Sequence, residues 1–210
     1  MWTAWKSLWV FKQNWPLYLI AAAFFILGAG LGVLTVNNLP AEQTTEIDSY
    51  LNVFLKQIEI LPLDSTRAAR AILYENIIFI SIIYFLGLTF VGIPFILGLV
   101  LGRGFILGFA VSCLTKTMSW PGFFLAAAAI LPQNLLYLPA LLIGVVTAIS
   151  FASLSLRRHN NYRVKLWNCL VGYTFIMLTV MAMTLGAGLI EAYFSPWLTR
   201  LTSGLIRTTL

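Results

Sequence analysis

Two side-chain amides bracketed by prolines are the polar groups best placed for specific chemistry in a very apolar stretch. Gln133 and Asn134 directly follow Pro132 in AILPQNLLYLPALLIG, and Pro139 comes seven residues after Pro132. Pro132 lacks a backbone donor and clashes with the carbonyl four residues earlier. We therefore interpret Pro132, Gln133, Asn134 and Pro139 as a structural helix break. The amides offer two acceptors and four N–H donors, which can satisfy the freed backbone groups near residues 128–132. Such breaks also line binding sites in transporters, but we favour the structural reading because no ionisable group accompanies the amides.

Residue types that could support catalysis are sparse and poorly spaced. His159 is the only histidine, and it lies in the basic stretch LRRHNNYRVK, where a solvated side chain is expected. The apolar segments contain no carboxylate pair for acid–base chemistry and no His, Cys or Asp cluster with metal-ligand spacing. Cys113 and Cys169 fall in apolar surroundings and are interpreted as small core residues. We therefore expect no enzymatic activity, no catalytic residue, no metal and no cofactor.

The composition places the chain in a lipid bilayer. Of its 210 residues, 60% are hydrophobic and only 10% are charged, whereas soluble domains carry about 25% charged residues. The net charge of +6 suits the anionic inner leaflet of a membrane rather than nucleic acid. The longest polar stretch, about residues 37–75, is too short for a separate soluble domain. A single membrane domain covering residues 1–210 is therefore expected.

The first membrane span is the clearest element. Leu17 to Val36 is a run of 20 apolar or small residues, which as a helix is about 30 Å long and matches the hydrocarbon core. Gly28 and Gly32 form a GxxxG motif within it. The motif indicates either a helix-docking face or the ordinary glycine usage of membrane helices, and the sequence leaves both readings open.

An amphipathic pattern follows the first span. Between Glu42 and Leu61 the apolar residues recur at helical offsets, while charged residues occupy other faces. This helix is expected to end near Pro62, and Asp64 is suited to cap a second helix that leads into the next span. The 37–75 segment is therefore predicted to be a helical hairpin outside the hydrocarbon core.

The apolar stretch 76–115 is long enough for two crossings, and two positions could hold the turn between them. A turn near Pro94 gives spans of similar length but buries Arg103, at about 3 kcal/mol on insertion scales and with no acid in either span to neutralise it. A turn at Arg103 leaves a short second helix. We favour Arg103 at or near the cytoplasmic face, with a buried polar position as the alternative.

The second half of the chain contains two further spans. Residues 120–152 would form one helix of about 50 Å, too long for a single crossing, so the Pro132–Pro139 region must divide it. A short re-entrant or interfacial piece, about 120–131, would precede a crossing at about 135–152. The final span covers 168–190.

Basic residues determine the predicted orientation. The 156–167 loop is the strongest basic cluster, and the positive-inside rule places it in the cytoplasm together with an amphipathic lead-in over residues 1–16. All seven acidic residues, the 37–75 loop and a 191–210 tail are then outside. The predicted fold is an all-α integral membrane protein with about five transmembrane helices, N-terminus inside and C-terminus outside. It has one broken or re-entrant helix near Pro132 and an extracytoplasmic helical hairpin.

Several segments are similar to one known family. GFFLAAAAILPQNLLYLPALLIG resembles the signature region of the stage II sporulation protein M family, integral membrane proteins of endospore-forming bacteria. The likeness extends to FILGAGLGVLTVNN, to GIPFILGLVLGRGFILGF and to the basic loop with the last span. The resemblance implies a non-enzymatic protein of the mother-cell membrane at the sporulation septum. Its implied partners are stage II sporulation proteins P and D, the peptidoglycan hydrolases that drive engulfment of the forespore.

Two functions are compatible with these observations. The first is a membrane scaffold that positions the hydrolases through the apolar stripe of the 37–75 hairpin, with Tyr50, Leu51, Phe54 and Ile58 as candidate partner-binding residues. The same stripe could instead pack on the protein's own spans or on lipid headgroups. The second is a small-molecule transporter or channel that uses the broken helix at Pro132–Pro139, with a homodimer completing the pathway.

Overall fold

Helices make up the regular structure of the described part of the chain, in which no strand occurs. The computed structural model describes residues 14–40, 65–157 and 166–194, together with eight residues between 42 and 53. Four long α-helices are followed by a π-helical turn, η1. In chain order the elements are α2 (Trp15–Asn37), α4 (Ser65–Gly87), α5 (Gly92–Arg157), α6 (Leu166–Leu189) and η1 (Ile190–Phe194).

Five stretches of these helices are long and apolar enough to cross a membrane, which confirms the predicted number of spans. The predicted orientation, with the N-terminus inside and the C-terminus outside, stays a prediction. The spans are Trp15–Asn37, Thr66–Gly87, Gly92–Lys116, Pro132–Ser155 and Trp167–Phe194.

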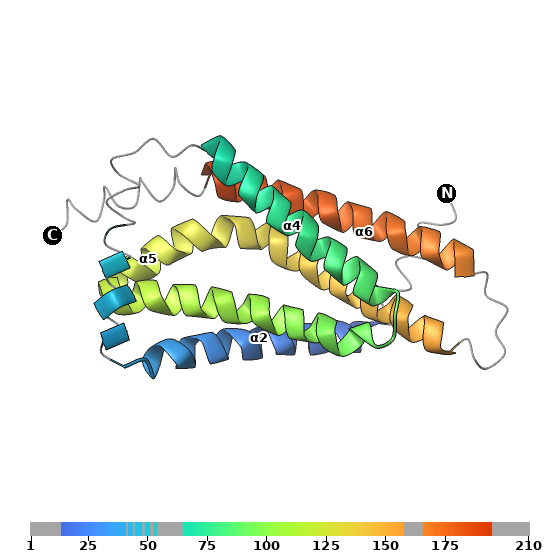
Figure 1. The fold of residues 1–210 in the computed structure, drawn as a ribbon, viewed down its shortest axis with the longest axis horizontal. Helices are drawn as coiled ribbons and strands as arrows, with labels where there is room; N and C mark the ends of the chain where they lie inside the picture. The colour runs from blue at the N-terminus through green and yellow to red at the C-terminus, as the bar shows by residue number, and fades with distance from the viewer. Residues whose placement is uncertain are drawn as a thin grey trace.

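Helix α5 contains two of these spans, which run in opposite directions (Figure 1). The first, green part of α5 lies beside α2, and the second, yellow to orange part returns toward α4 and α6. Every residue from Gly92 through Pro132 and Pro139 to Arg157 has helical backbone geometry, including those at which the chain reverses direction. The predicted helix break therefore does not appear as a separate element. The reversal lies between Lys116 and Pro132, upstream of the proline-bracketed amides.

The turn between the second and third spans lies at residues 88–91, three residues before Pro94. Its backbone closes through hydrogen bonds from the N–H groups of Leu88 to Phe85 (3.2 Å) and of Gly92 to Thr89 (3.1 Å). A side chain at Gly92 would collide with the Leu86 carbonyl, so glycine is required at the start of α5.

This turn corrects the preferred position of Arg103. The residue lies near the middle of the third span, Gly92–Lys116, and not at a boundary. Two acids predicted to be outside also lie within spans: Glu75 in Thr66–Gly87 and Glu191 in Trp167–Phe194. An acid at the edge of an apolar run predicts a span boundary, but the helices extend past both acids.

Four glycines form the contact between α2 and α5, and we refer to them as the glycine seam. Gly28 and Gly32 on α2 are buried, and a Cβ at either would collide with the backbone carbonyls of Leu101 or Phe105 on α5. Reciprocally, a Cβ at Gly104 or Gly108 on α5 would collide with carbonyls of α2. The helix-docking reading of the GxxxG motif is thus confirmed, because only glycine allows the two backbones to approach so closely.

The apolar core lies where α4, both spans of α5 and α6 meet. Ile83, Ile96, Leu141 and Val180 come from these four segments and are fully buried. The outer surface is also apolar, with large exposed side chains such as Phe85 and others on every span. An apolar surface of this extent is expected where helices face lipid rather than water.

Three stacked aromatic rings connect α4, α5 and α6. The ring of Tyr173 stacks on Tyr84 at 5.1 Å between centroids and on Phe151 at 4.6 Å. The Tyr173 hydroxyl donates to the Tyr84 carbonyl at 2.9 Å, and the Tyr84 hydroxyl lies 3.1 Å from the Thr174 hydroxyl. These contacts satisfy the tyrosine polar ends inside an apolar environment and fix the three helices relative to one another.

The described residues between 42 and 53 are helical, as the amphipathic pattern predicts. Tyr50 and Val53 are exposed in this segment, at 71% and 55%. Leu51, Phe54 and Ile58, the other residues of the predicted stripe, lie outside the described residues, as does the capping position Asp64. Helix α4 begins at Ser65, next to that position.

Candidate functional site

A cavity of about 280 Å³, with both polar and apolar side chains in its wall, lies between the helices of the bundle. Helices α2, α4 and α6, both spans of α5 and η1 contribute to its wall, so it belongs to the bundle as a whole. Its remaining lining is apolar, for example Phe25 and Ile106. The polar residues that line it are Asn76, Arg103, Gln133, Asn134, Tyr137 and Glu191.

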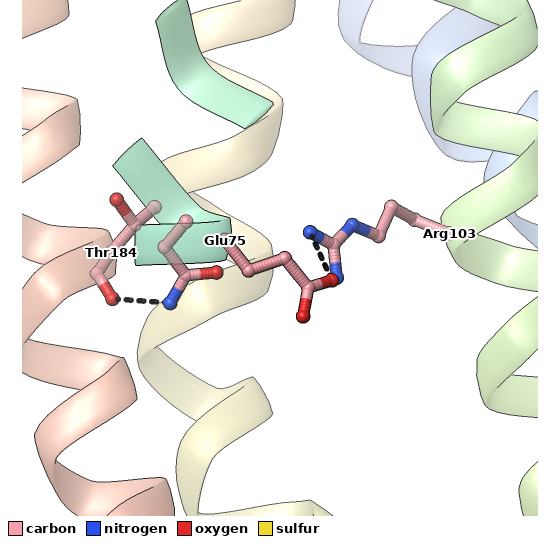
Figure 2. A network of polar contacts seen from close by, with 4 residues as sticks. Glu75, Arg103 and Thr184 are labelled. Carbon is pink, nitrogen blue, oxygen red and sulfur yellow. Dashed lines mark hydrogen bonds and ion pairs between the residues drawn. The ribbon is translucent and has the colours of Figure 1, made fainter. Parts of the chain in front are cut away.

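Arg103 provides the positive charge of the cavity. Its Nη2 atom lies 3.3 Å from Oε1 of Glu75 on α4, and Figure 2 shows the two side chains pointing toward each other from separate helices. The guanidinium also lies over the Phe79 ring at 4.2 Å and 5.6 Å from the Tyr137 ring centroid. A carboxylate and an aromatic face together compensate the cost of a guanidinium in the middle of a span.

Glu191 provides a negative charge on another wall. With its NH₂ group facing the carboxylate, the Gln133 amide donates to Glu191 at 2.7 Å to Oε2 and 3.2 Å to Oε1. Glu191 belongs to the π-helical turn η1. A π-helical turn is rare, and it often occurs at functional sites because it changes which face of a helix a side chain occupies.

Asn134 and Asn76 make local contacts that hold the backbone around the cavity. The Asn134 amide donates to the Ile130 carbonyl at 2.8 Å, within the stretch that Pro132 was expected to disturb. Asn76 is 5% exposed, and its amide donates to the Thr184 carbonyl of α6 at 3.2 Å. Of the two bracketed amides, Asn134 therefore bonds to the backbone while Gln133 contacts a charged group on another helix.

The hydroxyl of Tyr137 is buried and has no hydrogen-bond partner within the described part of the chain. The residue lines the cavity, and its ring lies near the Arg103 guanidinium. A buried hydroxyl without a partner costs about 1–3 kcal/mol, so an unpaired Tyr137 calls for a partner inside the cavity.

The structure brings together only part of the predicted site. Gln133, Asn134 and Arg103 meet at the cavity, whereas Pro139 is exposed and Tyr50 lies in the 42–53 segment, outside the spans. Sequence reasoning missed the contributions of Asn76, Tyr137 and Glu191. The available signal was the presence of polar side chains beside or inside apolar runs, which in membrane helices face the bundle interior.

The cavity holds charged and amide groups but no arrangement of a nucleophile with a positioned base among the described residues. Nor does any group of three or more His, Cys, Asp or Glu side chains suited to a metal occur in that part of the chain. The cavity presents a cation, a carboxylate and several hydrogen-bonding groups around a small volume.

Five apolar helices that are long enough to cross a membrane pack around a cavity with charged and amide groups in its wall, and they define a multi-pass α-helical membrane protein. The chain belongs to the stage II sporulation protein M family, whose family model matches residues 21–196. It is therefore a sporulation-related membrane protein, and the resemblance found in the sequence is confirmed. The family is not known as an enzyme family. No match was found among curated proteins or among solved structures.

Proposed function

We propose that the protein is a non-enzymatic scaffold that recruits and positions peptidoglycan hydrolases at the sporulation septum for engulfment of the forespore. Its place would be the mother-cell membrane, and its partners would be stage II sporulation proteins P and D. Family membership supports this role, because it implies a sporulation-related membrane protein. The cavity lacks a catalytic arrangement among the described residues, which agrees with a role carried out through partners.

The observation that carries the proposal is the exposed apolar face of the 42–53 segment. Tyr50 and Val53 are spaced i, i+3 on described helical residues and are 71% and 55% exposed. Residues at this spacing lie on one face of a helix. An exposed tyrosine on an apolar face outside the spans is the kind of anchor that protein interfaces use. Tyr50 belongs to the predicted stripe together with Leu51, Phe54 and Ile58, which lie outside the described residues, whereas Val53 is not part of that stripe.

The test places charge on this face. Tyr50→Glu combined with Val53→Glu should leave a stable protein that no longer recruits the hydrolases to the septum. Ser49→Glu is the matched control, since Ser49 is an exposed neighbour that accepts the same charge. Protein abundance is measured by blot and hydrolase position by fluorescence in the same sporulating cells. Normal recruitment at normal abundance with the double variant would refute docking at this face. Loss of the protein itself would assign the stripe to the fold.

The cavity favours a second candidate function, a small-molecule transporter or channel. It places Gln133 and Asn134 beside Arg103 and Glu191 inside the bundle, and intramembrane ionisable groups mark substrate or ion pathways. The test is time-dependent uptake of amino acids and inorganic ions into proteoliposomes. Uptake that is lost in Glu191→Gln and kept in Arg70→Gln, an exposed control on α4, supports transport. Equal rates with protein-free liposomes contradict it.

A further inference from the structure

The cavity separates two opposite charges that are only partly compensated. Arg103 contacts Glu75 through a single guanidinium nitrogen, although a guanidinium carries five N–H donors. Glu191 accepts from the neutral Gln133 amide and has no basic group within ion-pair distance in the described part of the chain. A ligand that carries both a negative and a positive group can therefore complement the two walls at once.

Two further observations point to a ligand of this kind. The Tyr137 ring centroid lies 5.6 Å from the Arg103 guanidinium, and the unpartnered hydroxyl of the same residue offers a donor to an oxyanion in the cavity. The π-helical turn η1 supplies Glu191 from another wall. Gln133 is the second residue of the fourth span, and Glu191 lies three residues before the end of the fifth.

The volume restricts the ligand to a small group. A cavity of about 280 Å³ is slightly smaller than typical sites for drug-sized ligands. It suits an amino acid or the headgroup of a lipid, but not a nucleotide or a folded peptide.

We infer that this cavity binds a small zwitterion, with its carboxylate or phosphate against Arg103 and Tyr137 and its primary ammonium against Glu191. This chemistry is shared by free amino acids and by the ethanolamine phosphate headgroup of a phospholipid. The inference concerns binding alone and does not depend on hydrolase recruitment or on transport. A bound headgroup without flux would leave the scaffold role unchanged.

The experiment measures thermal unfolding of the full chain in nanodiscs by tryptophan fluorescence. Discs of phosphatidylglycerol alone are the baseline, and phosphatidylethanolamine or phosphatidylcholine is added to matched discs. Phosphatidylcholine carries the same phosphate but no ammonium N–H donor. In a parallel arm, glycerophosphoethanolamine or an amino acid mixture is added in solution to the baseline discs.

A bound zwitterion should raise the Tm by about 3 °C or more. A rise with phosphatidylethanolamine alone assigns the lipid as the source, and a rise with a soluble probe assigns a free molecule. Either rise should disappear in Arg103→Gln and Glu191→Gln and persist in Arg70→Gln. Should the charge variants fail to accumulate, Tyr137→Phe removes only the hydroxyl and should reduce the rise. No rise with any probe, or a rise unchanged in these variants, overturns the inference and leaves a water-filled cavity.

Discussion

Arg103 and Glu75 join the third span to the second, with a guanidinium nitrogen 3.3 Å from a carboxylate oxygen. The two side chains are unequally enclosed, since that of Arg103 is 21% exposed and that of Glu75 is 69% exposed. Because both lie near the middle of their spans, either charge left alone would face a medium of low dielectric. The pair thus compensates two charges that the bilayer would otherwise penalise.

The pair should behave as a coupled unit in a double-mutant cycle. We expect Glu75→Gln and Arg103→Gln each to lower the free energy of unfolding, because each leaves one intramembrane charge uncompensated. The double variant should lose less than the sum of the two, by on the order of 1–3 kcal/mol. Thermal unfolding of the purified variants measures this coupling. Strict additivity would show that the pair contributes nothing.

The glycine seam predicts that the effect of a Gly→Ala substitution on stability depends strongly on where along α2 the glycine lies. Gly28→Ala or Gly32→Ala should lower the Tm and the amount of folded protein, because the added methyl collides with backbone that no side-chain rotation can move. Gly30→Ala is the control on the same helix, as no atom lies within 4 Å of its Cβ position. It should be neutral or stabilising by about 0.5–1 kcal/mol. Equal effects at all three positions would contradict close packing at the seam.

The two proline-bracketed amides, Gln133 and Asn134, should differ in how much they contribute to thermal stability. Gln133→Leu deprives the Glu191 carboxylate of its donor, and hydrogen bonds to charged groups are roughly twice as strong as neutral ones. Asn134→Leu removes a neutral contact with the Ile130 carbonyl, at a cost of about 1 kcal/mol. We therefore expect the larger loss of Tm in Gln133→Leu, partly restored by adding Glu191→Leu. The reverse order of the single variants would show that the Gln133–Glu191 contact is unimportant.

Orientation can be measured by cysteine labelling in intact cells. In a background with Cys113→Ala and Cys169→Ala, a cysteine at Asn38 or Glu46 should react with an impermeant maleimide added outside. A cysteine at position 160, in the basic loop, should react only after the cells are opened. Labelling with the opposite pattern would overturn the assignment of the basic loop to the cytoplasm.

Features with a local physical cause were predictable from the sequence. Span length and apolar composition located the first span at Leu17–Val36, within two residues of the observed Trp15–Asn37. The GxxxG motif located a helix contact, because only small residues permit backbone approach. The amphipathic pattern after Glu42 predicted helix, and the described residues there are helical.

The cavity depends on pairs that are distant in sequence. Glu75 and Arg103 are 28 residues apart, and Gln133 and Glu191 are 58 residues apart. The local sequence around Glu75 or Glu191 does not indicate that either acid contacts a side chain on another helix. An acid at the edge of an apolar run reads as the end of a span, and only the helix packing shows that it faces inward.

The glycine seam also has a mechanical consequence. At the four glycines of the seam, the backbones of α2 and of the Gly92–Lys116 span approach closely, and no side chain of these glycines separates them. A further contact joins the C-terminal ends of these two helices: Lys116 Nζ donates a hydrogen bond to the Val36 carbonyl at 2.9 Å. We expect the two helices to move together as one rigid unit rather than independently. We therefore expect a tilt of the helix that carries Arg103 to move α2 with it.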